Sequence, residues 1–119
     1  MEAILHFTAI TTGFVTSGPA CYCGNRDWFP KGSDHWVCSR CERSRRSAHR
    51  GIILNGPECY CGYRDWFVGD DGVICSYCER RRRSALDGYI LNGPECYCGH
   101  HDWLVAGGSY RCSYCERDR

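Results

Sequence analysis

Residues 59–80 read CYCGYRDWFVGDDGVICSYCER, and the chain contains this pattern three times. The other copies are residues 21–43, CYCGNRDWFPKGSDHWVCSRCER, and residues 96–117, CYCGHHDWLVAGGSYRCSYCER. All 12 cysteines of the 119-residue chain lie in these copies, four in each. The first cysteines of successive copies are 38 and 37 residues apart, a period typical of a tandem array of small modules.

Each repeat has fewer than 40 residues, which is too few for a hydrophobic core to hold a fold without disulfides or a metal. A C-x-C pair and a C-x-x-C pair, with 13 or 14 residues between them, can meet at one ion when a hairpin joins them. In an extended C-x-C, both thiolates point to the same side. We therefore expect three zinc ions, one per repeat, with these ligands: Cys21, Cys23, Cys38 and Cys41; Cys59, Cys61, Cys75 and Cys78; Cys96, Cys98, Cys112 and Cys115.

Two alternatives to zinc stay open at this point. Six disulfides would suit a secreted protein, but the start of the chain does not read as an export signal, because Glu2 replaces a positive charge and His6 interrupts the apolar run. Iron also accepts four thiolates. Residues 1–12 are too short an apolar run to span a membrane. Because the start of the chain also does not read as an export signal, we expect an intracellular (cytoplasmic) or virion-associated protein.

Each repeat predicts a short antiparallel sheet. Apolar pairs after the aspartate and before the second cysteine pair are typical of strands, and the glycine-rich segments between them are typical of hairpin turns. The first expected strand of each repeat is the apolar segment that begins at Gly13, Gly51 or Gly88. The second runs through the Asp-Trp pair: Trp28-Phe29, Trp66-Phe67-Val68 and Trp103-Leu104-Val105. The third enters the second cysteine pair: Trp36-Val37, Val73-Ile74 and Tyr110-Arg111. Residues 1–12 are expected to add one more strand.

A short connector helix is expected after each of the first two sheets. Ser39 precedes Glu42 by three residues, as Ser76 precedes Glu79 and Ser113 precedes Glu116, which matches a capping box. The helices would run from Arg43 to about Ala48 and from Arg80 to about Leu86.

Each repeat resembles a zinc ribbon, with two rubredoxin-like cysteine knuckles on a short sheet and a glycine after the first knuckle. The segment Trp36-Val37-Cys38-Ser39-Arg40-Cys41 is similar to zinc ribbons of primases and mobile-element proteins. The expected fold class is therefore small metal-stabilised β-rich (α+β) modules, three zinc ribbons in tandem. The expected divisions are the N-terminal strand at 1–12, module one at 13–50, module two at 51–87 and module three at 88–119.

Arginine is the second signal, since the chain has 14 arginines and one lysine. The planar guanidinium suits forked contacts to phosphate. The residues expected to contact nucleic acid are Arg43, Arg45, Arg46, Arg80, Arg81, Arg82 and Arg83. Three zinc tetrathiolates would lower the formal net charge from +1 to about −5, however. The alternative role of the arginines is therefore to offset the thiolate charge.

Aromatic residues also recur in register. Trp28, Trp66 and Trp103 are expected in the small core of each module, or else stacked on bases. The tyrosines within C-x-C face away from the metal and are candidates for a binding surface: Tyr22, Tyr60 and Tyr97.

A tetrathiolate site leaves no open coordination position, so we expect a protein that is not an enzyme. The leading hypothesis is a tandem zinc-ribbon protein that binds nucleic acid or an acidic protein surface, with no membrane partner. The alternative is a structural or scaffold protein that assembles with copies of itself or within a filament, virion or ribonucleoprotein. A thiol redox enzyme is the third hypothesis, and it requires reactive thiols in the native state.

Overall fold

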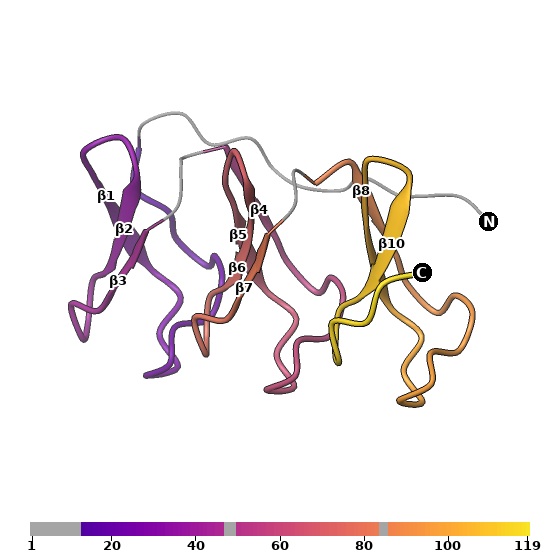
Figure 1. Cartoon of the computed structure of the whole chain (residues 1–119). Helices are drawn as coiled ribbons and strands as arrows, with labels where there is room; N and C mark the ends of the chain where they lie inside the picture. Colours follow the sequence, from indigo (N-terminus) through magenta and orange to yellow (C-terminus); the bar gives the residue numbers. More distant parts are fainter. Residues whose placement is uncertain (1–12, 47–49, 84–85) are drawn as a thin grey trace.

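The computed structural model describes residues 13–46, 50–83 and 86–119. Three small antiparallel sheets stand side by side in chain order, in a molecule of 37 × 24 × 19 Å (Figure 1). The first sheet contains β1 (Trp28–Lys31), β2 (His35–Cys38) and β3 (Ser44–Arg46). The second contains β4 (Gly51–Ile53), β5 (Trp66–Val68), β6 (Gly72–Cys75) and β7 (Arg81–Arg83). The third contains β8 (Gly88–Ile90), β9 (Trp103–Ala106) and β10 (Ser109–Cys112).

Each sheet is a meander in which every strand pairs with the next one along the chain. The register places the tryptophan of each Asp-Trp pair opposite the third cysteine of the same repeat: Trp28 with Cys38, Trp66 with Cys75, and Trp103 with Cys112. The central hairpin of each sheet therefore fixes where the second cysteine knuckle begins. The strands expected around the Asp-Trp pairs and before the second knuckles are confirmed.

The predicted connector helices are wrong, because the described part of the chain is all-β and contains no helix. Strand β3 lies where the first helix was expected, and β7 lies where the second was expected. Both strands pair antiparallel with the strand that enters the second knuckle, so β2 and β6 each gain a partner on that side.

The S-x-x-E segments do not begin helices because their glutamates take left-handed backbone conformations. Glu42, Glu79 and Glu116 have φ angles of 64°, 70° and 69°. In module two the Glu79 amide donates to the Cys75 carbonyl (3.0 Å), and the Cys75 amide donates to the Arg80 carbonyl (2.9 Å). These bonds close a tight turn and return the chain along β6, so the arginines after it are extended.

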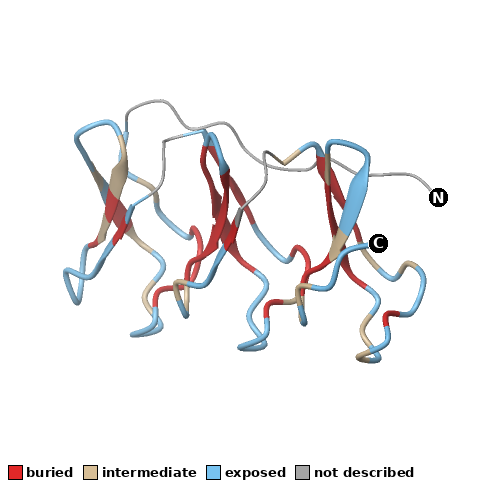
Figure 2. Cartoon of the chain, viewed as in Figure 1, coloured by how far each residue is buried: buried red, intermediate tan, exposed pale blue. Residues whose placement is uncertain are grey.

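Apolar side chains pack between modules as well as within them. Trp28 and Trp36 of module one form a cluster with Ile52, Phe67 and Ile74 of module two. Module three repeats the arrangement by inserting Tyr89 and Leu104 into the cluster around Trp66. The central sheet is therefore buried on both faces, whereas much of β1 and β10 is exposed (Figure 2).

Two expectations concern the ends of the chain and its relation to membranes. The N-terminal strand expected at 1–12 lies outside the described residues. Among the described residues, no helix has the length and apolar character needed to cross a membrane.

Candidate metal centres

The twelve cysteines come together as three groups of four, one group per repeat, as the spacing predicts. Within each group all four sulfur atoms lie within 4.8 Å of one another. The groups are Cys21, Cys23, Cys38 and Cys41; Cys59, Cys61, Cys75 and Cys78; and Cys96, Cys98, Cys112 and Cys115. Each C-x-C comes from the loop before the central hairpin and each C-x-x-C from the end of its second strand, so the hairpin brings the two pairs together.

Both knuckles are tight turns held by backbone hydrogen bonds. In the first knuckle of module two, the Gly62 amide donates to the Cys59 carbonyl over 2.8 Å. Gly62 has a φ of 98°, a backbone conformation that residues with a Cβ rarely adopt. Gly24 and Gly99 have φ angles of 92° and 95° in the other modules. The glycine of C-x-C-G is therefore required by the turn that points both thiols to one side.

The sulfur geometry fits a four-coordinate ion better than disulfides. The closest sulfur pairs are 3.4–3.6 Å apart in every group. A disulfide requires about 2.05 Å, whereas ligands about 2.3 Å from a tetrahedral zinc ion are about 3.8 Å apart. In each group the sulfurs converge on a common centre, so each group can hold one metal ion.

The thiols within a group perturb one another strongly. In module two, the hydrogen bond between Cys59 and Cys75 lowers the pKa of the Cys59 thiol, and the same bond raises the pKa of Cys75, aided by burial. Without a metal, one thiol of the group is therefore readily deprotonated, whereas the negative charge of that thiolate opposes deprotonation of a second thiol beside it. A bound cation would remove that opposition and allow all four sulfurs to act as thiolates.

Each group has a buried side and an exposed side. The first cysteine of each pair is buried, whereas the second is exposed or half-buried. Two buried arginines from the sheets approach the buried side: the Nη2 atoms of Arg45 and Arg82 lie 3.8 Å from the sulfurs of Cys21 and Cys59. Both side chains also lie over a tryptophan ring, Trp28 and Trp66 respectively.

The same two arginines join one module to the next. Arg45 donates from Nε to the Ser76 carbonyl over 2.8 Å, and Arg82 donates from Nη2 to the Ser113 carbonyl over 2.7 Å. Each is only 1% exposed. Arg45 and Arg82 are therefore unavailable to phosphate, although the sequence proposed them as nucleic-acid contacts.

The other proposed nucleic-acid contacts lie nearer the surface. Arg43 and Arg80 pair with the glutamate of the following module at 2.9 Å, Glu79 and Glu116 respectively. Arg46 lies 3.7 Å from Asp34 with 70% of its side chain exposed. Arg81 is exposed, donates to the Arg46 carbonyl over 2.9 Å and lies 3.9 Å from Asp71. Arg83 is in β7, and its side chain is outside the described part of the chain.

An aspartate and a serine complete each joint. The serine was expected to cap a connector helix, and the aspartate had no expected role. Asp65 accepts hydrogen bonds from the Ala20 amide and from Arg26 of module one, both 3.0 Å long, through Oδ2. Its Oδ1 accepts from the Asn55 amide of its own module (3.1 Å). The Ser76 hydroxyl donates to the Ala20 carbonyl over 2.7 Å.

The joint between modules two and three repeats these contacts. Asp102 accepts from the Glu58 amide and from Arg64, both 3.0 Å long, and Ser113 donates to the Glu58 carbonyl over 2.6 Å. The signal for these roles was present, since both residues recur at fixed positions in every copy, in Asp-Trp and in C-S-x-C.

The tyrosines within C-x-C lie at the same joints. Tyr22 packs on Tyr77 and Tyr60 packs on Tyr114, with ring centroids 5.2 and 5.1 Å apart. Tyr22 and Tyr60 remain 58% and 57% exposed, whereas Tyr97 in module three is 83% exposed.

Comparison of the chain with family models, with curated proteins and with solved structures found no match.

Proposed function

We propose that the chain is a non-enzymatic scaffold, a stiff rod of three zinc-stabilised modules that holds bound partners at a fixed spacing. The observation that carries this proposal is the buried arginine that joins each module to the next. Arg45 and Arg82 are each 1% exposed and each donates to a carbonyl of the following module. Modules joined in this way lose their independent motion, which a flexible string of modules would keep.

Zinc is the metal we propose for each cysteine group. Four thiolates in a closed set leave no position for substrate, which supports a structural ion and a chain without catalytic activity. The bond energy of the ion would replace the hydrophobic core that so short a module cannot build. Native mass spectrometry tests this part directly, because three zinc ions and three iron ions add different masses to the chain.

Nucleic-acid binding stays a prediction, and the arrangement of the arginines gives it less support than the scaffold. Two of the seven proposed arginines are buried, and two more pair with glutamates across a joint. Zinc loading would also make the whole chain negative, at about −5, which disfavours contact with a phosphate backbone. Among the seven proposed arginines, the exposed ones with described side chains that do not pair with a glutamate across a joint are Arg46 and Arg81.

Two measurements on the zinc-loaded chain test the scaffold against the nucleic-acid hypothesis. In ¹⁵N NMR relaxation, a rod gives one set of rotational correlation times shared by the three modules, and independent tumbling of the modules would contradict the proposal. Fluorescence anisotropy with labelled single- and double-stranded oligonucleotides should show no steep salt dependence. Tight, salt-sensitive binding that is lost when Arg46 and Arg81 become Ser would instead support a nucleic-acid protein.

A further inference from the structure

The two joints inside the chain define a common pattern. We call the side of a module that contacts the following module its trailing face, and the side that contacts the preceding module its leading face. At both joints the trailing face supplies a tryptophan, a buried arginine, and the backbone amide and carbonyl of the residue before the first cysteine, which is Ala20 or Glu58. The leading face supplies an apolar side chain after the tryptophan, an aspartate, a serine and a glutamate.

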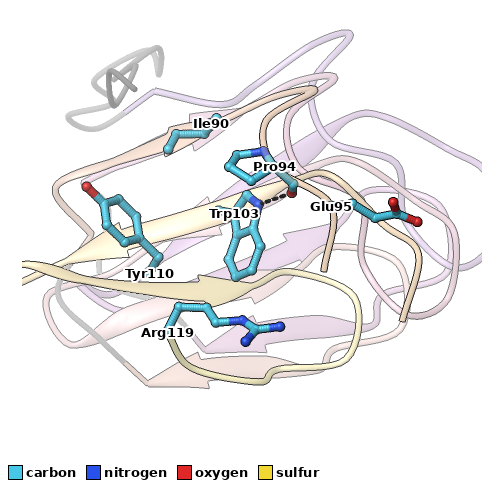
Figure 3. A pocket seen from close by; sticks show the side chains of 6 residues that line it. All are labelled: Ile90, Pro94, Glu95, Trp103, Tyr110 and Arg119. Carbon is cyan, nitrogen blue, oxygen red and sulfur yellow. Dashed lines mark hydrogen bonds between the residues drawn. The ribbon is translucent and has the colours of Figure 1, made fainter. Parts of the chain in front are cut away.

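The trailing face of module three has the same groups but no neighbour among the described residues. Arg119 pairs with Tyr110 through two backbone hydrogen bonds, as Arg45 pairs with Trp36 and Arg82 with Val73. Arg119 is exposed, and its guanidinium donates no hydrogen bond to another described residue. A pocket of about 260 Å³ opens beside it, lined by Ile90, Pro94, Glu95, Trp103, Tyr110 and Arg119 (Figure 3).

The leading face of module one is exposed in the same way. Phe29 occupies the position of Phe67 and Leu104, yet it is 50% exposed whereas they are 0% and 4% exposed. Phe14 occupies the position of Ile52 and is 68% exposed. The two rings contact each other edge to face and line a pocket with Asp27 and Ser39. Within the described residues, modules one and three thus present two exposed faces that match the two halves of the internal joint.

We propose that the trailing face of module three binds the leading face of module one in a second copy of this chain. The inference deepens the scaffold function proposed above, on which it rests, by naming a partner of the rod. The occupant is a second copy because the internal joints already pair faces of these two kinds twice. The contact is heterologous, so it extends copies head to tail, into an open filament or a closed ring.

Each internal contact has its counterpart in the proposed joint. Arg119 would donate to the Ser39 carbonyl of the second copy, as Arg82 donates to the Ser113 carbonyl. The Glu95 amide would donate to Asp27, as the Glu58 amide donates to Asp102. Asp27 is prepared for this contact, since its Oδ1 already accepts from the Ser17 amide as Asp102 accepts from the Asn92 amide.

Charge and aromatic contacts at the rim also complement each other. Arg117, which lies over the Tyr97 ring, would pair with Glu42, as Arg80 pairs with Glu116. Arg40 of module one replaces the tyrosine that receives Tyr22 or Tyr60 at the internal joints, and it would lie over the exposed Tyr97 ring. A second contact also differs from the internal joints, because His101 stands in place of Arg26 and Arg64. Asp27 would therefore have a weaker partner, and the proposed joint should be weaker than the internal ones.

Sedimentation velocity of the full zinc-loaded chain over a concentration series tests the proposal. The wild-type chain should show an average mass that rises with concentration. Phe29→Asp makes the apolar contact of the leading face polar, and Arg119→Glu removes the charged hydrogen bond of the trailing face. Each variant alone should therefore associate at least about tenfold more weakly than wild type. Mixed in equal amounts, the two variants should form a dimer and nothing larger, because only one pair of intact faces remains.

Asp70→Arg, in an exposed turn of the central module, should leave association unchanged, and zinc content should be equal in all variants. A wild-type chain that stays monomeric, single variants that associate like wild type, or a mixture without dimer would each overturn the proposal. A monomer whose three modules still share one rotational correlation time would overturn this inference alone, whereas independently tumbling modules would remove the scaffold function as well.

Discussion

Replacing Arg82 with alanine should uncouple modules two and three. The side chain is 1% exposed, donates to the Ser113 carbonyl over 2.7 Å and lies 5.4 Å from the centre of the Trp66 ring. A hydrogen bond from a charged group contributes about 1.5–3 kcal/mol, and a partly desolvated cation–π contact adds about 1 kcal/mol. We therefore expect Arg82→Ala to lower the free energy of unfolding by about 2–4 kcal/mol.

The matched control is Arg119→Ala, which removes the corresponding side chain from module three. Arg119 is exposed and has no following module within the described residues, so its removal should cost less than about 0.5 kcal/mol. Both variants are compared with wild type by urea unfolding at one fixed free-zinc concentration and at low protein concentration, followed by tryptophan fluorescence. Equal losses for Arg82→Ala and Arg119→Ala, or a negligible loss for Arg82→Ala, would refute the role given to the buried arginine.

Three further predictions concern the metal and the joints. A strong chelator should unfold the chain, with loss of the β signal in circular dichroism, and a chain that keeps its fold without metal would contradict this expectation. Metal loading should also fall as the pH falls, because protons compete with the metal for the thiolates. Asp65→Asn should cost about 1–3 kcal/mol because Arg26 loses its charged partner, whereas Asp27→Asn, with no preceding module among the described residues, should cost far less in the same urea assay. Ser76→Ala should cost about 1 kcal/mol by leaving the Ala20 carbonyl without its donor, and Ser39→Ala is the near-neutral comparison; similar losses at both serines would argue against the joint.

Cysteine spacing predicted the grouping of all twelve thiols because that arrangement depends on short-range geometry. A C-x-C pair and a C-x-x-C pair each form within one turn, and a single hairpin brings them together. The strands beside them were also predictable, since apolar pairs such as Trp66-Phe67 stand between turn residues. Both predictions needed only residues that are close in the sequence.

The connector helices were predicted wrongly because the partners of the S-x-x-E segment are distant in the sequence. The Ser76 hydroxyl bonds to the Ala20 carbonyl, 56 residues away, instead of capping a helix. Arg82 has a backbone partner in Val73 and a side-chain partner 31 residues away, in Ser113. A capping box is identified from local spacing alone, so a prediction based on it does not take account of a competing strand partner or a neighbouring module.

The constancy of the joint has a consequence for how such a chain can change in length. Because both joints use an aspartate, a serine and an arginine at the same repeat positions, each module presents compatible sides to its neighbours. An in-frame duplication of residues 51–87 would insert a further module that uses the same joint contacts on both sides. Three units span 37 Å, so each duplication or deletion in the gene would change the reach of the protein by about 12 Å.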